Sequence, residues 1–167
     1  FSIIIKYNNP QKIMPNWCEN RVRISDDGEN SEQFDKLVKL LDGPNPFNAI
    51  YPQPDWKNIP NEDGELPVTE DHKDADGKVI FQSTNFPKSG KNDDRWYSWC
   101  VDNWGTKWDM CQKSTAEVDE GWAEFEFMTA WAPPYGIYDK IVEDFPDVGI
   151  SWFYDEPGME FAGYLPN

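Results

Sequence analysis

Alternating apolar and polar positions predict three main strands in this chain. The first covers residues 21–24, where Val22 and Ile24 are expected to face inward. The second covers residues 122–131, where Glu124, Glu126 and Met128 alternate with apolar or small residues, namely Ala123, Phe125, Phe127, Thr129 and Trp131. The third is a long strand whose inward set is Val148, Ile150, Trp152 and Tyr154. Such alternation is typical of an antiparallel sheet with one solvated face.

Apolar residues at helical spacing predict three helices between these strands. Asn30 and Gln33 resemble a capping box for the first, and Gly43 is expected to end it in the left-handed conformation. Its apolar stripe is Phe34, Leu37, Val38 and Leu41. The second helix is expected to start at Asp93 or Asp94 and to end at Gly105, with the stripe Trp96, Trp99, Cys100 and Trp104. The third lies between Pro134 and Pro146, with the stripe Ile137, Ile141, Val142 and Phe145.

The remaining segments are less regular. Residues 44–93 are rich in proline and acids and are expected to form an insertion, because a loop of this length is uncommon in a compact domain. One strand-like run, 78–82, follows an Asp-Gly turn signal inside it. Residues 106–113 are interpreted as a strand and 159–165 as an edge strand. Residues 1–13 contain no acid and form an atypical extension, either an upstream addition before Met14 or an extra strand at 2–7.

The order of these elements predicts a single α+β domain over residues 14–167. Two β–α units flank a pair of strands linked by a hairpin, and this is the pattern of a ferredoxin-like antiparallel sheet with helices packed on one face. The proline- and acid-rich insertion at about 44–93 interrupts it.

Charge changes the expected partners. Thirty-one acids oppose fifteen bases, so the formal net charge is −16. Phosphate binding needs a basic footprint, so direct nucleic-acid binding is disfavoured, and so is binding to an anionic membrane. A sheet face with glutamates likewise disfavours an RNA-recognition domain. The partners that remain are basic proteins or peptides.

No catalytic or cofactor motif is visible in the sequence. Cys18, Cys100 and Cys111 are far apart and odd in number, which favours free thiols in a reducing cytoplasm. His72 is the only histidine and lies in a charged turn. The chain has no run of apolar residues long enough to span a membrane. We therefore expect no catalytic residue, metal site or cofactor.

Four of the nine tryptophans fall within residues 96–109, "WYSWCVDNWGTKWD". Trp96, Trp99 and Trp104 share one helical face and are expected to pack against the sheet. Trp108 follows Gly105, and Trp56 lies in the insertion. These two are the indoles left as candidates for a sugar- or peptide-binding surface.

Four blocks carry a resemblance to a known family. They are "MPNWCENRVRISD" at 14–26, "WYSWCVDNWGTKWD" at 96–109, "FEFMTAWAPP" at 125–134 and "YDEPGMEFAG" at 154–163. In this order they resemble the uncharacterised YubB-like family of phage and plasmid proteins, whose C-terminal module is described as ferredoxin-like. The resemblance implies this fold and a mobile-element origin, and it brings no site residue with it.

Two functions remain in competition. In the first, the chain is a non-catalytic, acidic binding protein that engages a basic host protein, as an interaction module or as a decoy imitating nucleic acid. The acids expected to form an ordered row are Asp119, Glu120, Glu124 and Glu126. In the second, the chain binds or hydrolyses a carbohydrate or nucleotide with exposed tryptophans and nearby carboxylates. The sequence names no small-molecule ligand.

Overall fold

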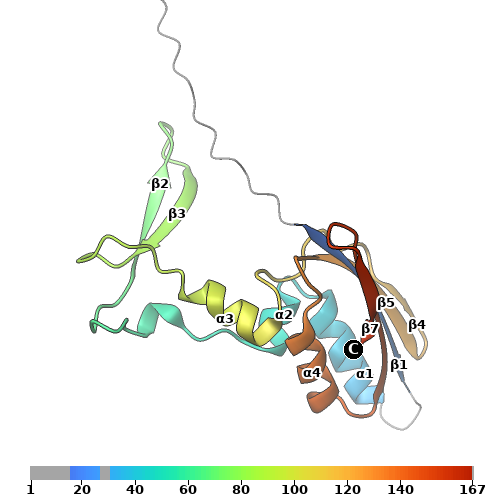
Figure 1. The fold of residues 1–167 in the computed structure, drawn as a ribbon. Coiled ribbons are helices and arrows are strands. Elements are labelled where there is room, and N and C mark those ends of the chain that lie inside the picture. Colours follow the sequence, from blue (N-terminus) through green and yellow to red (C-terminus); the bar gives the residue numbers. More distant parts are fainter. Residues whose placement is uncertain (1–15, 27–30, 167) are drawn as a thin grey trace, which may run out of the picture.

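A five-stranded antiparallel sheet organises the computed structural model, which describes residues 16–26 and 31–166 (Figure 1). The strand order is β4–β5–β1–β6–β7. The strands are β1 (Trp17–Asp26), β4 (Glu117–Asp119), β5 (Trp122–Ala130), β6 (Val148–Glu156) and β7 (Phe161–Leu165). The extension at 1–13 and the cap expected at Asn30 lie outside the described residues.

The sheet has ferredoxin-like connectivity. The central strand β1 pairs antiparallel with both β5 and β6, although β1 ends at Asp26 and its partners begin only at Trp122 and Val148. Helix α1 (Ser31–Asp42) follows β1, and helix α4 (Tyr135–Asp144) connects β5 to β6. The two β–α units therefore interleave as the sequence predicted, and the expected edge strand is β7.

One face of the sheet forms the core. Helices α1 and α4 cover this face in Figure 1. The inward side chains of the three long strands are buried against apolar residues of both helices: Val22, Ile24, Phe125, Phe127 and Trp152 from the sheet, and Phe34, Leu37, Leu41, Ile137 and Ile141 from the helices. Large rings supply much of this area, which explains how a chain of low aliphatic content builds a core.

Helix α3 (Arg95–Trp104) carries the tryptophan-rich stretch but does not lie on the sheet. It contacts α4, so the expected packing of this helix on the sheet was wrong. Trp104 is buried, its ring 5.9 Å from that of Phe47, and its indole N–H donates to the carbonyl of Tyr51 at 2.8 Å. Trp99 and Trp96 are half-buried beside the core. Gly105 ends the helix with a φ of 86°, as the sequence predicted.

Four local predictions were wrong. Residues 106–113 form bends rather than a strand, joined to β5 through a bridge between Cys111 and Met128 and a hydrogen bond from the Thr106 hydroxyl to the carbonyl of Ala130. Gly43 ends α1 without a positive φ. Trp131 lies beyond the end of β5, with a φ of 72°, and is exposed. Val142 is exposed because it lies on the solvent side of α4.

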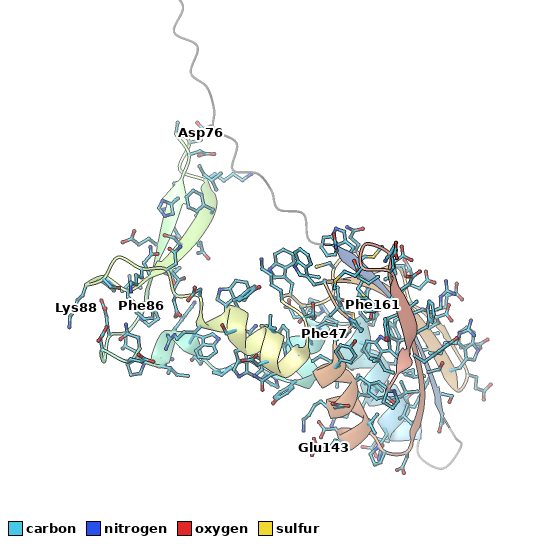
Figure 2. All side chains as sticks on the ribbon, viewed as in Figure 1. Phe47, Asp76, Phe86, Lys88, Glu143 and Phe161 are labelled. Carbon is cyan, nitrogen blue, oxygen red and sulfur yellow. The ribbon has the colours of Figure 1, made fainter. Side chains whose placement is uncertain are left out.

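The predicted insertion contains two different parts. Helix α2 (Pro46–Ile50) belongs to the core, since Phe47 and Ile50 are buried there (Figure 2). After Tyr51 the chain leaves the core through a 3-10 turn (Trp56–Asn58) and a hairpin of β2 (Val68–Lys73) and β3 (Val79–Asn85). The hairpin projects away from the five-stranded sheet (Figure 1), and Asp76 lies in its tip. None of the helices in the described ranges is long and apolar enough to cross a bilayer.

Arg95 joins the insertion to the start of α3. Its guanidinium lies between two rings, 5.1 Å from the centre of Trp56 and 5.2 Å from that of Phe86. It donates to the carbonyls of Pro60 and Trp56 at 3.1 and 3.2 Å. Asp93 accepts from Nε and Nη2 of the same group, each at 2.8 Å. Cation–π stacking and a bidentate ion pair thus connect three segments of the chain.

This ion pair predicts an acid-sensitive contact. Hydrogen bonds from Arg95 hold the pKa of the buried Asp93 carboxyl below its ordinary value of 3.8. Because the pKa is lower in the folded protein than in the unfolded one, the pair stabilises the insertion above about pH 4 and loses this contribution as the pH falls further. We expect the protection of the amides in residues 84–95, measured as the ratio of the intrinsic to the observed exchange rate at each pH, to fall below this pH. Asp93→Asn should remove that pH dependence, whereas Asp94→Asn at the exposed neighbouring position should retain it. An identical pH profile for both variants would contradict the assignment.

Candidate functional site

The face of the sheet opposite α1 and α4 forms an open surface of the fold. No helix of the described residues covers it (Figure 1). The strand register aligns its outward residues in rows, and three successive rows form the surface described below. The first row is Glu126, Arg21, Phe153 and Tyr164; the second is Glu117, Glu124, Arg23 and Ser151; the third is Asp119, Trp122, Ser25 and Gly149. We call these three rows the open face.

Ion pairs between β1 and β5 run through the middle of the open face. Nη2 of Arg21 lies 2.6 Å from Oε1 of Glu126, and Nε of Arg23 pairs with Oε2 of Glu124. Arg21 also lies 3.8 Å from Glu124. The hydrogen bond to Glu124 raises the pKa of the Arg23 guanidinium. Exposed pairs of this kind add little stability, so their main effect is to fix the positions of the charges.

Aromatic side chains flank the charged centre. The rings of Phe153 and Tyr164 lie 5.3 Å apart on β6 and β7, and 61% of Tyr164 is exposed. Trp122, at the other end of the face, is 39% exposed. A hollow of about 640 Å³ lies beside Trp122 and Ile150, and one of about 280 Å³ lies beside Phe153 and Tyr164. Aromatic anchors beside such hollows, with charges around them, are typical of protein-binding surfaces.

The predicted acidic residues all lie on or beside this face. Glu124 and Glu126 are bound by the two arginines, and Glu124 is largely covered. Asp119 and Glu120 are exposed at the β4–β5 turn, where Asp119 accepts a hydrogen bond from the amide of Glu120. The open rows carry four carboxylates against two guanidinium groups. The local balance is therefore acidic, but it contains two ordered cations that the sequence analysis had not placed there.

The two predicted indoles lie away from the open face. Trp56 is part of the Arg95 cluster, and its indole N–H donates to Oε1 of Gln53 at 3.4 Å. Trp108 lies in the bends after α3, with its ring 6.3 Å from that of Trp17. The structure therefore does not bring Trp56, Trp108 and the acidic residues into one site. Their use in binding stays a prediction.

The thiols and the histidine are held in structural surroundings. Burial raises the pKa of Cys18 to about 12 and that of Cys100 to about 11, and burial also raises the pKa of Cys111. His72 lies on the projecting hairpin, stacked 4.1 Å from the ring of Phe81 and hydrogen-bonded to Ser83 at 2.8 Å. Within the described ranges, no group of three or more His, Cys, Asp or Glu side chains is arranged to hold a metal ion.

The raised thiol pKa values predict slow cysteine chemistry. A thiol reacts with iodoacetamide as its thiolate, which is scarce when the pKa lies far above the ambient pH. At pH 8 we expect Cys18 and Cys100 to remain unmodified in the folded protein and all three cysteines to react quickly in denaturant. Mass spectrometry of the alkylated peptides measures this directly. Fast modification of Cys18 in the folded state would contradict its burial.

Comparison with known proteins supports the fold of the C-terminal part. The family model described as a ferredoxin-like domain in Api92-like protein matches residues 103–166. The matched stretch starts at the end of α3 and includes β4, β5, α4, β6 and β7. Strand β1 and helix α1, which complete the ferredoxin-like arrangement, precede it. No curated protein and no solved structure matches the chain.

Proposed function

We propose that this protein is a non-catalytic binding module that takes a basic polypeptide on the open face of its sheet. The observation that carries the proposal is the composition of that face. Trp122 and Tyr164 are exposed beside hollows, and the carboxylates of the β4–β5 hairpin lie at its border. Exposed aromatics supply the area that a partner buries, and the carboxylates select the sign of its charge.

Charge complementarity decides between a basic polypeptide and a nucleic acid. The chain carries a net charge of −16, and Glu124 and Glu126 already neutralise the two arginines of the open face. Phosphates would have to displace these carboxylates and approach an acidic molecule. A polypeptide rich in Lys or Arg is instead attracted, because the negative electrostatic field of the protein accelerates its approach.

The partner class that fits this chemistry best is a nucleic-acid-binding protein of a host cell, whose basic surface is built to contact phosphates. In this account the acidic module imitates such a phosphate array. We further propose a phage or other mobile-element origin and action in the host cytoplasm. The four sequence blocks and the three free cysteines support these two assignments.

A charge-matched pair of variants tests the proposal. The first variant neutralises three acids of the β4–β5 hairpin on the open face, with Glu117→Gln, Asp119→Asn and Glu120→Gln. The second neutralises three exposed acids of the insertion with Glu62→Gln, Asp63→Asn and Glu70→Gln. Binding to immobilised protamine, an arginine-rich protein, is measured at low and high ionic strength. We expect the hairpin variant to associate roughly tenfold more slowly and with a weaker salt dependence.

The control variant should bind as the unmodified protein does. Trp122→Ala should also weaken binding, mainly through faster dissociation, because it removes apolar contact area. Equal losses in the two charge variants would show that protamine responds only to net charge, and the proposal would then be dropped. Tighter binding to single-stranded DNA than to protamine would also overturn it.

A further inference from the structure

The two ends of the tryptophan-rich stretch meet in a cleft between α3 and the segment around α2. The cleft has a volume of about 380 Å³, within the range of small-molecule sites. Trp96 comes from the first turn of α3, and Trp108 comes from the bends after it. Amide side chains line the opposite wall, from Asn48 on α2 and Gln53 just after it. The cleft and the open face have no residue in common.

The acceptor atoms of both amides already have partners. Oδ1 of Asn48 accepts from the backbone N–H of Gln53 at 3.0 Å. Oε1 of Gln53 accepts from the indole N–H of Trp56 at 3.4 Å. These bonds orient the two side chains, so that each amide has its NH2 group left over as a donor.

Asp109, the one carboxylate among the described residues that line the cleft, is occupied as well. Oδ1 of Asp109 accepts from the backbone N–H groups of Phe47 and Met110 at 2.9 and 2.8 Å, and Oδ2 accepts from that of Asn48 at 3.0 Å. Asp109 therefore holds α2 in place, and both of its oxygens are engaged by backbone N–H groups.

Lys107 adds a cation to these donors. Its ammonium lies 4.3 Å from the centre of the Trp108 ring and 5.3 Å from that of Tyr97. Among the described residues it forms no salt bridge, in contrast to the arginines. The groups still able to bind a ligand therefore include one ammonium, the NH2 groups of Asn48 and Gln53, and the exposed amide of Asn45, which also lines the cleft. This is the reverse of the acidic character of the molecule as a whole.

We propose that this cleft binds a saccharide through a uronate unit. The sugar carboxylate accepts hydrogen bonds from Lys107, Asn48 and Gln53, and the apolar face of the sugar ring packs on Trp96 or Trp108. A single cation with neutral amide donors matches a singly charged carboxylate. A nucleotide phosphate carries more charge and prefers several cations, whereas Lys107 is the one cationic side chain among the described residues that line the cleft.

Trigalacturonate is the probe, and its fully methyl-esterified form is the matched ligand control, because esterification removes the negative charges and keeps the sugar rings. Isothermal titration calorimetry at low ionic strength should detect binding of the acid and at least about tenfold weaker binding of the ester, the range expected for charge-assisted hydrogen bonds. Adenosine monophosphate serves as the nucleotide probe. Absence of trigalacturonate binding, equal binding of acid and ester, or tighter binding of the nucleotide would each overturn the proposal.

Two substitutions locate the site. Gln53→Glu keeps the acceptor for Trp56 and replaces the free NH2 with a negative oxygen, so it should weaken trigalacturonate binding at least about tenfold. Gln112→Glu, at an exposed position outside the cleft, makes the same change in charge and should leave binding unchanged. Lys107→Met keeps the apolar stem beside Trp108 and should also lose binding. Unchanged affinity in Gln53→Glu or Lys107→Met, with an unfolding temperature like that of Gln112→Glu, would contradict the assignment.

Discussion

Trp152→Ala is expected to destabilise the protein by about 3–5 kcal/mol, the cost of truncating a fully buried large aromatic side chain. Trp152 lies on β6 with its ring edge-on to Phe127 and Tyr138, at 5.8 and 6.2 Å. Its indole N–H donates to Oδ1 of Asn20 at 3.1 Å. The substitution therefore opens a cavity and leaves the buried Asn20 oxygen without a donor. Urea unfolding followed by far-ultraviolet circular dichroism measures the loss.

Two further variants make this result interpretable. Trp152→Phe keeps a ring but removes the donor, so it should cost less, about 1–3 kcal/mol, and remain folded if the alanine variant does not. Trp122→Ala truncates an exposed indole on the other face and should cost under about 1 kcal/mol. Similar losses at positions 152 and 122 would contradict the assignment of the core face.

Gly136→Ala is expected to destabilise the protein by about 3 kcal/mol or more, at the upper end of the cost of overpacking. Gly136 lies in the first turn of α4, where the helix meets the end of α3. A Cβ atom there would lie 1.8 Å from the carbonyl oxygen of Asn103 and 2.8 Å from its carbon. Both are backbone atoms, so α3 and α4 must separate to accommodate one methyl group.

Helix propensity alone predicts the opposite sign. In a helix, alanine is favoured over glycine by about 1 kcal/mol, so a stabilising effect would show that the two helices do not meet this closely. Val142→Ala is the control, since it shortens an exposed side chain on the same helix and should change stability by less than about 1 kcal/mol. Thermal and urea unfolding of the two variants decides the matter.

The main elements of the fold could be predicted because their patterns are strong. The first strand and the two helices on the sheet each have one buried and one solvated side. The buried sides contain Val22 and Ile24 in the strand, and Leu37 and Ile141 in the helices. Strand β2 was not predicted, because its sequence "VTEDHK" is mostly polar and exposed, so alternation gives no signal. The bends at 106–113 were mistaken for a strand because their side chains contact distant parts of the fold, as Asp109 contacts α2, and a single bridge from Cys111 to Met128 replaces the ladder.

The candidate surfaces depend on contacts between distant residues. Glu124 and Glu126 were recognised as an acidic row, but pairing with Arg21 and Arg23 follows only from the register of β1 against β5. The alternation of Arg21 and Arg23 in the sequence indicates that both face the same side of β1. Only the pairing of β1 with β5 shows that this side also carries Glu124 and Glu126. The cleft could not be predicted from the sequence. Asn48 and Gln53 act as donors there only because the fold already binds their amide oxygens, and the sequence does not show these hydrogen bonds.

Nuclear magnetic resonance of the arginine side chains tests the open-face account most directly. The chain has three arginines: Arg21 and Arg23 lie in the open face, and Arg95 is enclosed by Trp56 and Phe86 in the insertion. On titration with protamine, the Nε–H signals of Arg21 and Arg23 and the Trp122 indole signal should shift together and saturate, while Arg95 stays unchanged. Shifts that spread over the exposed acids of α4 and the insertion, with Arg21 and Arg23 unmoved, would contradict binding at this face.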